Sequence, residues 1–297
     1  MKRMSVYPRQ AVCLTALFLL GDIYRVSTAA GRDSWLALLF AAVAAIPVYL
    51  ICGWMLAKAA YLDFFDMLKK ALGRFGGALA TVLLALYSLC TALVTLKHIT
   101  VFITKTQLPN PPHIFPAILL FTAAYLFSKG AGTLAKWAVA VFAVVGLILV
   151  LTAAAGVPEM DFAAVLPLLD RPAEGVAHAS LNMFAFPFLQ CVLVLPVLSR
   201  HGNGIRPVRV MLGGLAIAAL VYMLVTLQTL FLIGGYNLSA AEFPVFMAAK
   251  VPSVGSFFTR FEDGIAVCAI LASLTKLSVC LYTAAKAVRS LFGKRVQ

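Results

Sequence analysis

The chain has 297 residues, of which 63% are hydrophobic and only 12% are charged, and its formal net charge is +13. A soluble globular domain is roughly half apolar and about a quarter charged, so this composition, with a mean hydropathy of +0.98, excludes an ordinary soluble domain. The basic residues lie in short loops between long apolar runs, which is typical of a membrane protein and not of a protein that binds nucleic acid. The sequence predicts an all-α integral membrane protein whose main surroundings are the lipid bilayer.

Taken in chain order, the apolar runs predict eight transmembrane helices, because about 20 helical residues cross a hydrocarbon core of ~30 Å. We expect these spans at 10–30, 35–57, 78–103, 114–127, 133–155, 178–199, 208–234 and within 257–285. Amphipathic segments at 61–72 and 241–251 lie between spans, and a basic tail is expected at 286–297. The whole chain, 1–297, therefore forms one transmembrane domain.

The distribution of lysine and arginine predicts the topology. Sixteen of these residues fall on one side of the eight spans, five fall on the other side and three lie inside spans. Positive charge is enriched on the cytoplasmic side of membrane proteins, so both termini are expected in the cytoplasm. An alternative is a signal peptide, because basic residues precede the apolar run 12–20; Asp22, Tyr24 and Arg25 fit that interpretation poorly.

The first span contains an unusual polar group of residues. Asp22 lies about 18 Å into the span at a rise of 1.5 Å per residue, and Arg25 lies three residues further on, on the same helical face. Ionisable groups near the bilayer centre are costly and usually face a partner or a cavity. Either the helix is broken at Gly21 to line a polar site, or Asp22 forms an ion pair that only holds helices together.

The sixth span is interrupted as well. Asn182, Pro187, Gln190 and Pro196 stand in an otherwise apolar run. Proline has no N–H and crowds the preceding helical turn, so we expect a kink or an unwound turn between Asn182 and Pro187. Such breaks form midplane binding sites in transporters, although a proline kink in a packing helix explains the same pattern.

Further candidates lie on the third and eighth spans. Lys276 is in the middle of the last span, where it is either a fixed cation or a side chain that snorkels to the cytoplasmic face. We expect Asp22 to pair with Arg25 or with Lys276. The hypothesis is a ligand site at the midplane, between spans one, three, six and eight, formed by Gly21, Asp22, Thr91, Asn182, Phe184, Gln190 and Lys276.

Signatures of catalysis are not found in the sequence. The glycine pairs at 130–132 and 202–204 have no strand–helix context for nucleotide binding. The four histidines are scattered, and all six cysteines lie in apolar runs without metal-ligand spacing. The sequence therefore predicts no enzyme, no cofactor and no metal site.

Several stretches, in order along the chain, together resemble the spore germination permease family. These are PRQAVCLTALFLLG at 8–21, AGRDSWLALL at 30–39, FFDMLKKALGRFGG at 64–77, LPNPP at 108–112, VPEMDFAAVLPLLD at 157–170, NMFAFPF at 182–188 and the segment 243–282. The resemblance implies the inverted five-helix repeats of the amino acid–polyamine–organocation superfamily, with breaks in spans one and six. The first repeat would be 10–155, and 176–285 would be an incomplete second repeat, since the family has ten spans.

The resemblance also implies a function. The family comprises the B subunits of nutrient germinant receptors, so the chain is expected to sense a small nutrient such as an amino acid in the spore inner membrane. Its partners would be A-type and C-type receptor subunits. A secondary amino acid transporter and a structural membrane subunit without a ligand are the alternatives. Gln190, His98 and Val101 stand where acidic residues are common in the family, so the resemblance does not extend to ion coupling.

Overall fold

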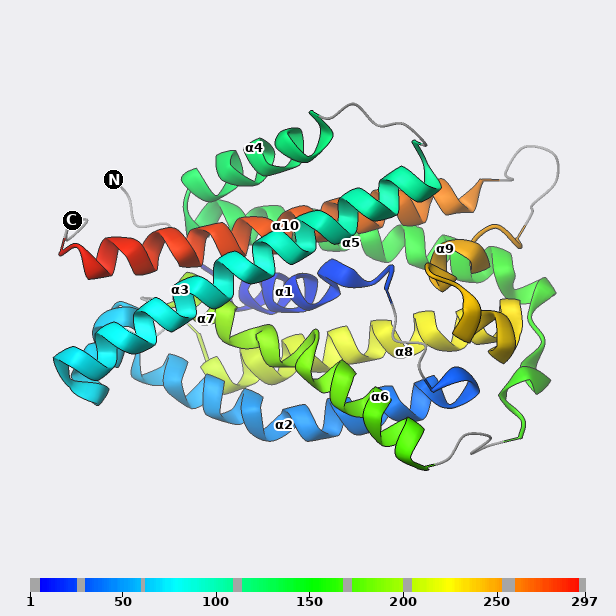
Figure 1. Cartoon of the computed structure of the whole chain (residues 1–297), viewed down its shortest axis with the longest axis horizontal. Helices are drawn as coiled ribbons and strands as arrows, with labels where there is room; N and C mark the ends of the chain where they lie inside the picture. The colour runs from blue at the N-terminus through cyan, green and yellow to red at the C-terminus, as the bar shows by residue number, and fades with distance from the viewer. Residues whose placement is uncertain are drawn as a thin grey trace.

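The computed structural model describes residues 6–25, 30–59, 62–108, 114–167, 173–199, 205–252 and 260–293. Every regular element in these ranges is a helix, and the helices form an elongated bundle (Figure 1). The first half of the chain has α1 Pro8–Leu19, the 3-10 helices η1 Leu20–Asp22 and η2 Gly31–Asp33, then α2 Ser34–Lys58, α3 Phe64–Thr106, α4 Phe115–Ser128 and α5 Ala131–Gly156. The second half has η3 Val157–Glu159, η4 Phe162–Val165, α6 Ala173–Ala185, η5 Phe188–Val194, α7 Leu195–Leu198, α8 Pro207–Ala240, α9 Pro244–Ala248 and α10 Phe261–Leu291.

The predicted all-α membrane fold is confirmed. Within the described residues, six helical segments are long and apolar enough to cross a membrane: Gly31–Lys58, Phe64–Thr106, Ala131–Glu159, Ala173–Leu198, Pro207–Ala240 and Phe261–Leu291. The α1 and α4 helices have 12 and 14 residues, which cover about 18 and 21 Å and are shorter than a ~30 Å hydrocarbon core. The expected total of eight spans stays a prediction.

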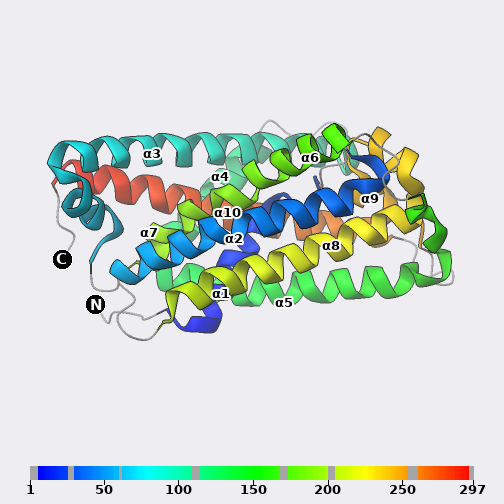
Figure 2. The same ribbon diagram turned by 90° about the horizontal axis from the view of Figure 1, so that it is seen from below.

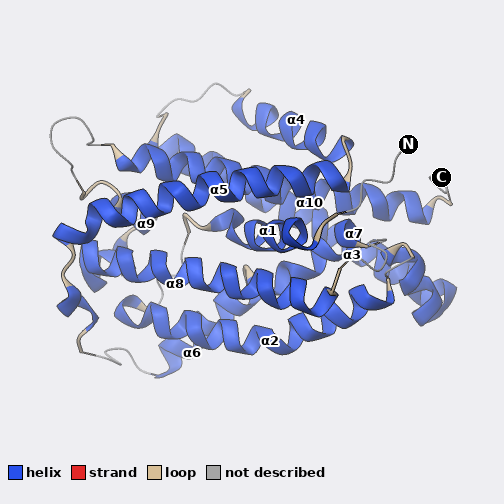
Figure 3. Ribbon diagram, turned by 180° about the vertical axis from the view of Figure 1, so that it is seen from behind, coloured by secondary structure: helices blue, strands red, loops and turns tan. Residues whose placement is uncertain are grey.

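The α1 helix lies in the middle of the bundle. Its residues from Leu14 to Leu20 are all fully buried, as expected for a helix that is apolar on every face. In the view from behind, α1 lies between α5 and α8 (Figure 3). The contact with α8 is close, because a Cβ atom added at Gly214 would lie 2.6 Å from Thr15 Cβ.

The α10 helix is the second central element, and it packs against α3, α4 and α5. All nine residues from Ala272 to Cys280 are buried, including Ser273, Thr275 and Lys276. The α3 and α10 helices run in opposite directions (Figure 1). Ser88 of α3 donates a hydrogen bond of 2.7 Å to the Cys280 carbonyl of α10. A helix with so many polar groups faces protein, because lipid offers them no partners.

Two long helices bend at glycines with positive φ. Gly73 in α3 has φ 75° and Gly234 in α8 has φ 73°, a conformation that glycine adopts without the steric cost of a Cβ atom. The bend at Gly73 separates the predicted amphipathic segment from the long arm of α3. The second predicted amphipathic segment contains α9.

Three boundaries differ from the sequence prediction. The α10 helix continues to Leu291, so the first part of the expected tail at 286–297 is helical and packed. Lys286 is held there by Asp63 and by the end of α7. The sixth span begins at Ala173 rather than at 178, because Glu174 and Gly175 extend the helix beyond the apolar run on which the prediction rested. The first span is α-helical only to Leu19.

The two ends of the bundle carry different charges. The end of α2, the beginning of α3, the beginning of α8 and the end of α10 lie together at one end (Figures 1 and 2). The basic residues on or next to these four segments are Lys58, Lys69, Lys70, Arg74, Arg206, Arg209, Lys286 and Arg289. The opposite end carries most of the described acidic residues: Asp33, Glu159, Asp161, Glu174, Glu242, Glu262 and Asp263. The bundle is therefore strongly polarised along its long axis.

Candidate ligand site

The first span is interrupted at mid-bundle, and its freed carbonyl groups are already bonded. The α-helix stops at Leu19 and a 3-10 turn follows. Tyr222 of α8 donates a hydrogen bond of 2.9 Å to the Leu19 carbonyl, and Ser273 of α10 donates one of 2.7 Å to the Gly21 carbonyl. Hydroxyl groups on neighbouring helices thus replace the missing helical hydrogen bonds, as the membrane interior requires.

Gly21 allows α10 to approach this turn. A Cβ atom at position 21 would lie 2.6 Å from Lys276 Cδ and 2.8 Å from Lys276 Cβ. Such distances are shorter than van der Waals contact, so a side chain at position 21 would displace the lysine.

A buried ion pair lies at the interruption. Lys276 Nζ pairs with Asp22 Oδ2, and the two side chains are 0% and 2% exposed. The predicted pairing of Asp22 with Arg25 or Lys276 is confirmed with Lys276 as the partner, while Arg25 is exposed. The snorkelling interpretation of Lys276 is wrong, because its side chain is fully buried and its ammonium group pairs with Asp22.

An aromatic ring covers the same lysine. Lys276 Nζ lies 4.4 Å from the centre of the Phe186 ring and 5.6 Å from that of Phe18. Such contacts stabilise a cation by roughly 1 kcal/mol, and by about 2 when it is desolvated. Phe186 also contacts His98 of α3, with ring centres 6.4 Å apart.

The sixth span is also interrupted, in the region where the sequence predicts a break. The α6 helix ends at Ala185, the Phe186–Pro187 peptide bond is cis and a 3-10 helix begins at Phe188. Tyr49 of α2 donates a hydrogen bond of 3.1 Å to the Phe188 carbonyl. Thr283 of α10 donates one of 2.8 Å to the Leu193 carbonyl. Hydroxyl groups from neighbouring helices therefore bond free carbonyls here too.

The α3 helix packs beside the same part of α10 that carries Lys276 and Ser273. The helices α3 and α10 are antiparallel, and Ser88 bonds to the Cys280 carbonyl, so this register brings Thr91 and Thr95 to the level of Lys276 and Ser273. Thr91 is 4% exposed and Thr95 is fully buried.

The remaining predicted site residues differ in burial and in their contacts. Asn182 is on the exposed face of α6, where its side-chain nitrogen lies 3.3 Å from His178 Nδ1. Phe184 is half-buried and packs against the apolar core. Gln190 is 3% exposed, and its Oε1 atom has no hydrogen-bond partner among the described residues. The structure thus brings Gly21, Asp22 and Lys276 together, with Thr91 at their level.

Four residues at the interruption were not among the predicted site residues. Ser273 and Lys276 are three apart on α10, and Thr91 and Thr95 are four apart on α3, so helical spacing could have indicated Ser273 and Thr95. Tyr24 packs its ring against Phe102, with ring centres 4.7 Å apart. No pattern in the sequence indicates that the Phe186 ring covers Lys276.

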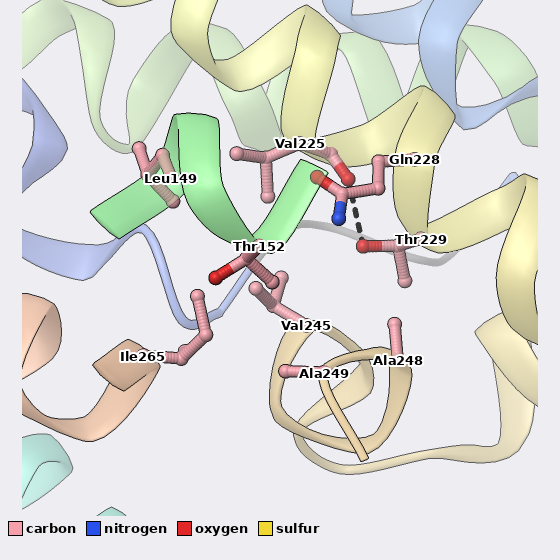
Figure 4. Close-up of a pocket in the computed structure, with 9 residues that line it drawn as sticks. All are labelled: Leu149, Thr152, Val225, Gln228, Thr229, Val245, Ala248, Ala249 and Ile265. Carbon is pink, nitrogen blue, oxygen red and sulfur yellow. Dashed lines mark hydrogen bonds between the residues drawn. The ribbon is translucent and has the colours of Figure 1, made fainter. Parts of the chain in front are cut away.

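A small cavity lies elsewhere, between α5, α8, α9 and α10 (Figure 4). Its lining includes Thr152, Gln228 and Thr229. The Thr152 and Thr229 hydroxyls are bonded to carbonyls of their own helices. The cavity has a volume of about 10 Å³, which is room for roughly one water molecule, so it is too small for an amino acid. The described residues contain no group of three or more histidine, cysteine, aspartate or glutamate side chains placed to hold a metal ion.

A bundle of long apolar helices with two interruptions at mid-bundle, and a buried ion pair at one of them, defines an all-α, multi-spanning membrane protein. A comparison with family models then identifies the family. The model described as spore germination protein, the spore germination permease family, matches residues 6–297, and the chain belongs to this family. A comparison with curated proteins gave no match. The resemblance found in the sequence is confirmed, and the protein is a germination-related integral membrane protein of a transporter or receptor type.

Proposed function

We propose that this protein is the permease-like subunit of a spore germinant receptor and that it senses a small nutrient such as an amino acid. One observation carries the proposal: a chain matched by the family model over residues 6–297 holds a buried ion pair at the interruption of α1. Ionisable groups deep in a membrane protein usually mark a site for a solute or an ion. The Asp22–Lys276 pair is therefore the centre of the proposed nutrient site.

The proposal includes a location and partners. The protein would lie in the spore inner membrane and act with A-type and C-type receptor subunits. Both termini would be cytoplasmic, which is supported by the basic residues at the end of the bundle where α3 begins and α10 ends. Positive charge at that end matches the usual orientation of membrane proteins.

The test is a germinant panel on spores that lack this gene. We expect the deletion to abolish germination with one nutrient or a few nutrients and to leave the response to others intact. Complementation with the wild-type gene should restore the response. Complementation with Asp22→Asn should not restore it at the original nutrient concentration, although the protein accumulates.

Other outcomes separate the alternative functions. Uptake of a labelled amino acid by liposomes that contain the purified protein alone would favour a secondary transporter. Deletion spores that respond normally to every nutrient would contradict the receptor function. A general defect that no single nutrient explains would favour a structural subunit.

A further inference from the structure

The short first part of α3, residues 64–72, is fastened to the end of α10. Lys69 donates hydrogen bonds to the Ser290 carbonyl and, at 2.8 Å, to the Ser290 hydroxyl. Asp63, directly before the short part, pairs with Lys286 at 3.1 Å. Figure 2 shows the short part turning across the end of α10 instead of continuing along the bundle. These contacts fix the position of the short part and of the bend that follows it.

The bend at Gly73 lies at the depth of a lipid headgroup layer. The long arm of α3 runs from the bend to Thr106, which is roughly 50 Å at a rise of 1.5 Å per residue. A bilayer is about 40–45 Å thick with its headgroups, so an arm tilted by about 20° reaches from one headgroup layer to the other. The bend is tight, because a Cβ atom at Gly77 would lie 2.8 Å from the Lys69 backbone nitrogen.

An exposed apolar stripe runs along the long arm and ends beside this bend. It is formed by Phe75, Leu79, Leu83 and Leu86, which are three or four residues apart and therefore share one face of the helix. Exposed apolar side chains on a helix of this length face lipid. Phe75, with 84% of its surface exposed, is the member nearest to the bend. Its ring therefore marks the level where the acyl chains meet the headgroups.

Two exposed cations stand beside Phe75 in the sequence, at the bend. Lys70 ends the short part and Arg74 follows Gly73, and both side chains are exposed. A guanidinium group matches the geometry of a phosphate, and an ammonium group adds a compact positive charge. Asp66, which is also exposed, lies one turn before Lys70 and offsets part of this charge. The bend thus combines a net positive charge with an aromatic ring at headgroup depth.

We propose that Lys70 and Arg74 bind the phosphate of an anionic phospholipid, while Phe75 packs against its acyl chains. The site is distinct from the proposed nutrient site and does not depend on it. Basic residues next to an exposed aromatic side chain are typical of segments that bind anionic lipids. A soluble phosphate would gain nothing from Phe75, whose ring continues the lipid-facing stripe. Lipid bound here would attach to the part of α3 that holds the end of α10.

The experiment measures lipid binding to the purified full chain by native mass spectrometry from a neutral detergent. Phosphatidylglycerol is the anionic probe, and phosphatidylcholine with the same acyl chains is the neutral comparison. The site variants are the double substitution of Lys70→Gln with Arg74→Gln, and Phe75→Ser alone. The matched control is Arg206→Gln with Arg209→Gln, since these two arginines are exposed at the same end of the bundle and carry the same total charge (Figure 1).

We expect the double site variant to raise the apparent Kd of phosphatidylglycerol about thirtyfold, because two basic residues near an anionic headgroup are lost. Phe75→Ser should raise it several-fold, and Asp66→Asn should lower it, since a repulsive charge is removed. The control variant should bind as the wild type does. The Kd of phosphatidylcholine should be the same in every variant, and free glycerol 3-phosphate should not compete.

Three results would overturn the inference. Equal losses in the site and control double variants would show that positive charge attracts the lipid without a specific site. Full competition by glycerol 3-phosphate would show that the cations bind a soluble phosphate. A wild-type chain that prefers neither lipid would assign the exposed cations to another partner, such as an acidic protein segment. None of these results affects the proposed nutrient-sensing function, which is tested by germination.

Discussion

At the scale of single residues, the Asp22–Lys276 pair dominates the interior. A buried ion pair is not in itself a source of stability, because the cost of taking both charges out of water offsets their attraction. Losing one partner is different, since the remaining charge has nothing to neutralise it. The effects of substituting Asp22 and Lys276 on stability are therefore expected to be strongly coupled, whatever the net contribution of the pair to folding.

We predict that Lys276→Met and Asp22→Asn each destabilise the protein by about 3–5 kcal/mol, because each leaves or unbalances a buried charge. The double variant should be less destabilised than the sum of the two single variants. Thermal unfolding of the purified variants measures this as a double-mutant cycle. Additive effects would mean that the two side chains do not interact in the folded protein.

At the scale of the elements, the second half of the interrupted sixth span, η5 and α7, is held from two sides. On one side, Cys52 of α2 and Cys191 of η5 bring their Sγ atoms to 3.7 Å. On the other side, Lys286 of α10 donates hydrogen bonds to the Pro196 carbonyl at 2.7 Å and the Ser199 hydroxyl at 2.8 Å. Lys286 also pairs with Asp63 at 3.1 Å.

We predict that a copper–phenanthroline oxidant links Cys52 to Cys191 in isolated membranes, because the two sulfur atoms need to approach by less than about 2 Å to reach disulfide bonding distance. Mass spectrometry of the digested protein would identify the linked peptides. Cys90, which is exposed on α3, provides an internal control that should not pair with either residue. Linkage of Cys90 to Cys191 instead would contradict the packing of α2 against η5.

We predict that Lys286→Met loosens the end of the bundle where α3, α7 and α10 meet. The substitution removes a cation that holds three segments together, so the buried thiols of Cys191 and Cys280 should react several-fold faster with a membrane-permeable maleimide. Arg289→Met is the matched control, since Arg289 is exposed on the same helix. Equal labelling rates in wild type and in Lys286→Met would show that this contact does not hold the end closed.

At the scale of the whole molecule, the charges at the two ends predict the orientation. A reporter fused after residue 297 should be active in the cytoplasm, and a reporter inserted within 253–259 should be active outside. An external signal from the C-terminal fusion would contradict the topology.

Composition and apolar run lengths were sufficient to predict the class of fold, because a bilayer demands long apolar helices. The interruption of the first span and the pairing of Asp22 were also predictable, since an aspartate and a lysine at one depth must neutralise each other. The orientation of Asn182 could not be predicted, because α6 is apolar on several faces. Which face of α6 points toward lipid depends on how the helix packs. The burial of Lys276 likewise depends on α10 being central, which only tertiary contacts decide.

The hydroxyl groups that bond to the interrupted spans affect how often the protein opens, that is, how often the two interruptions separate from their neighbouring helices. Three of the four such bonds, from Tyr222, Ser273 and Tyr49, join both interruptions to neighbouring helices. Each contributes on the order of 1 kcal/mol net, so an opening that exchanged all three for bonds to water would cost about 3 kcal/mol. If these three bonds alone set the free energy of opening, roughly one molecule in a hundred and fifty would be open at any moment. A ligand that binds the open form about 150-fold more tightly than the closed form would make the two forms equally populated when saturating.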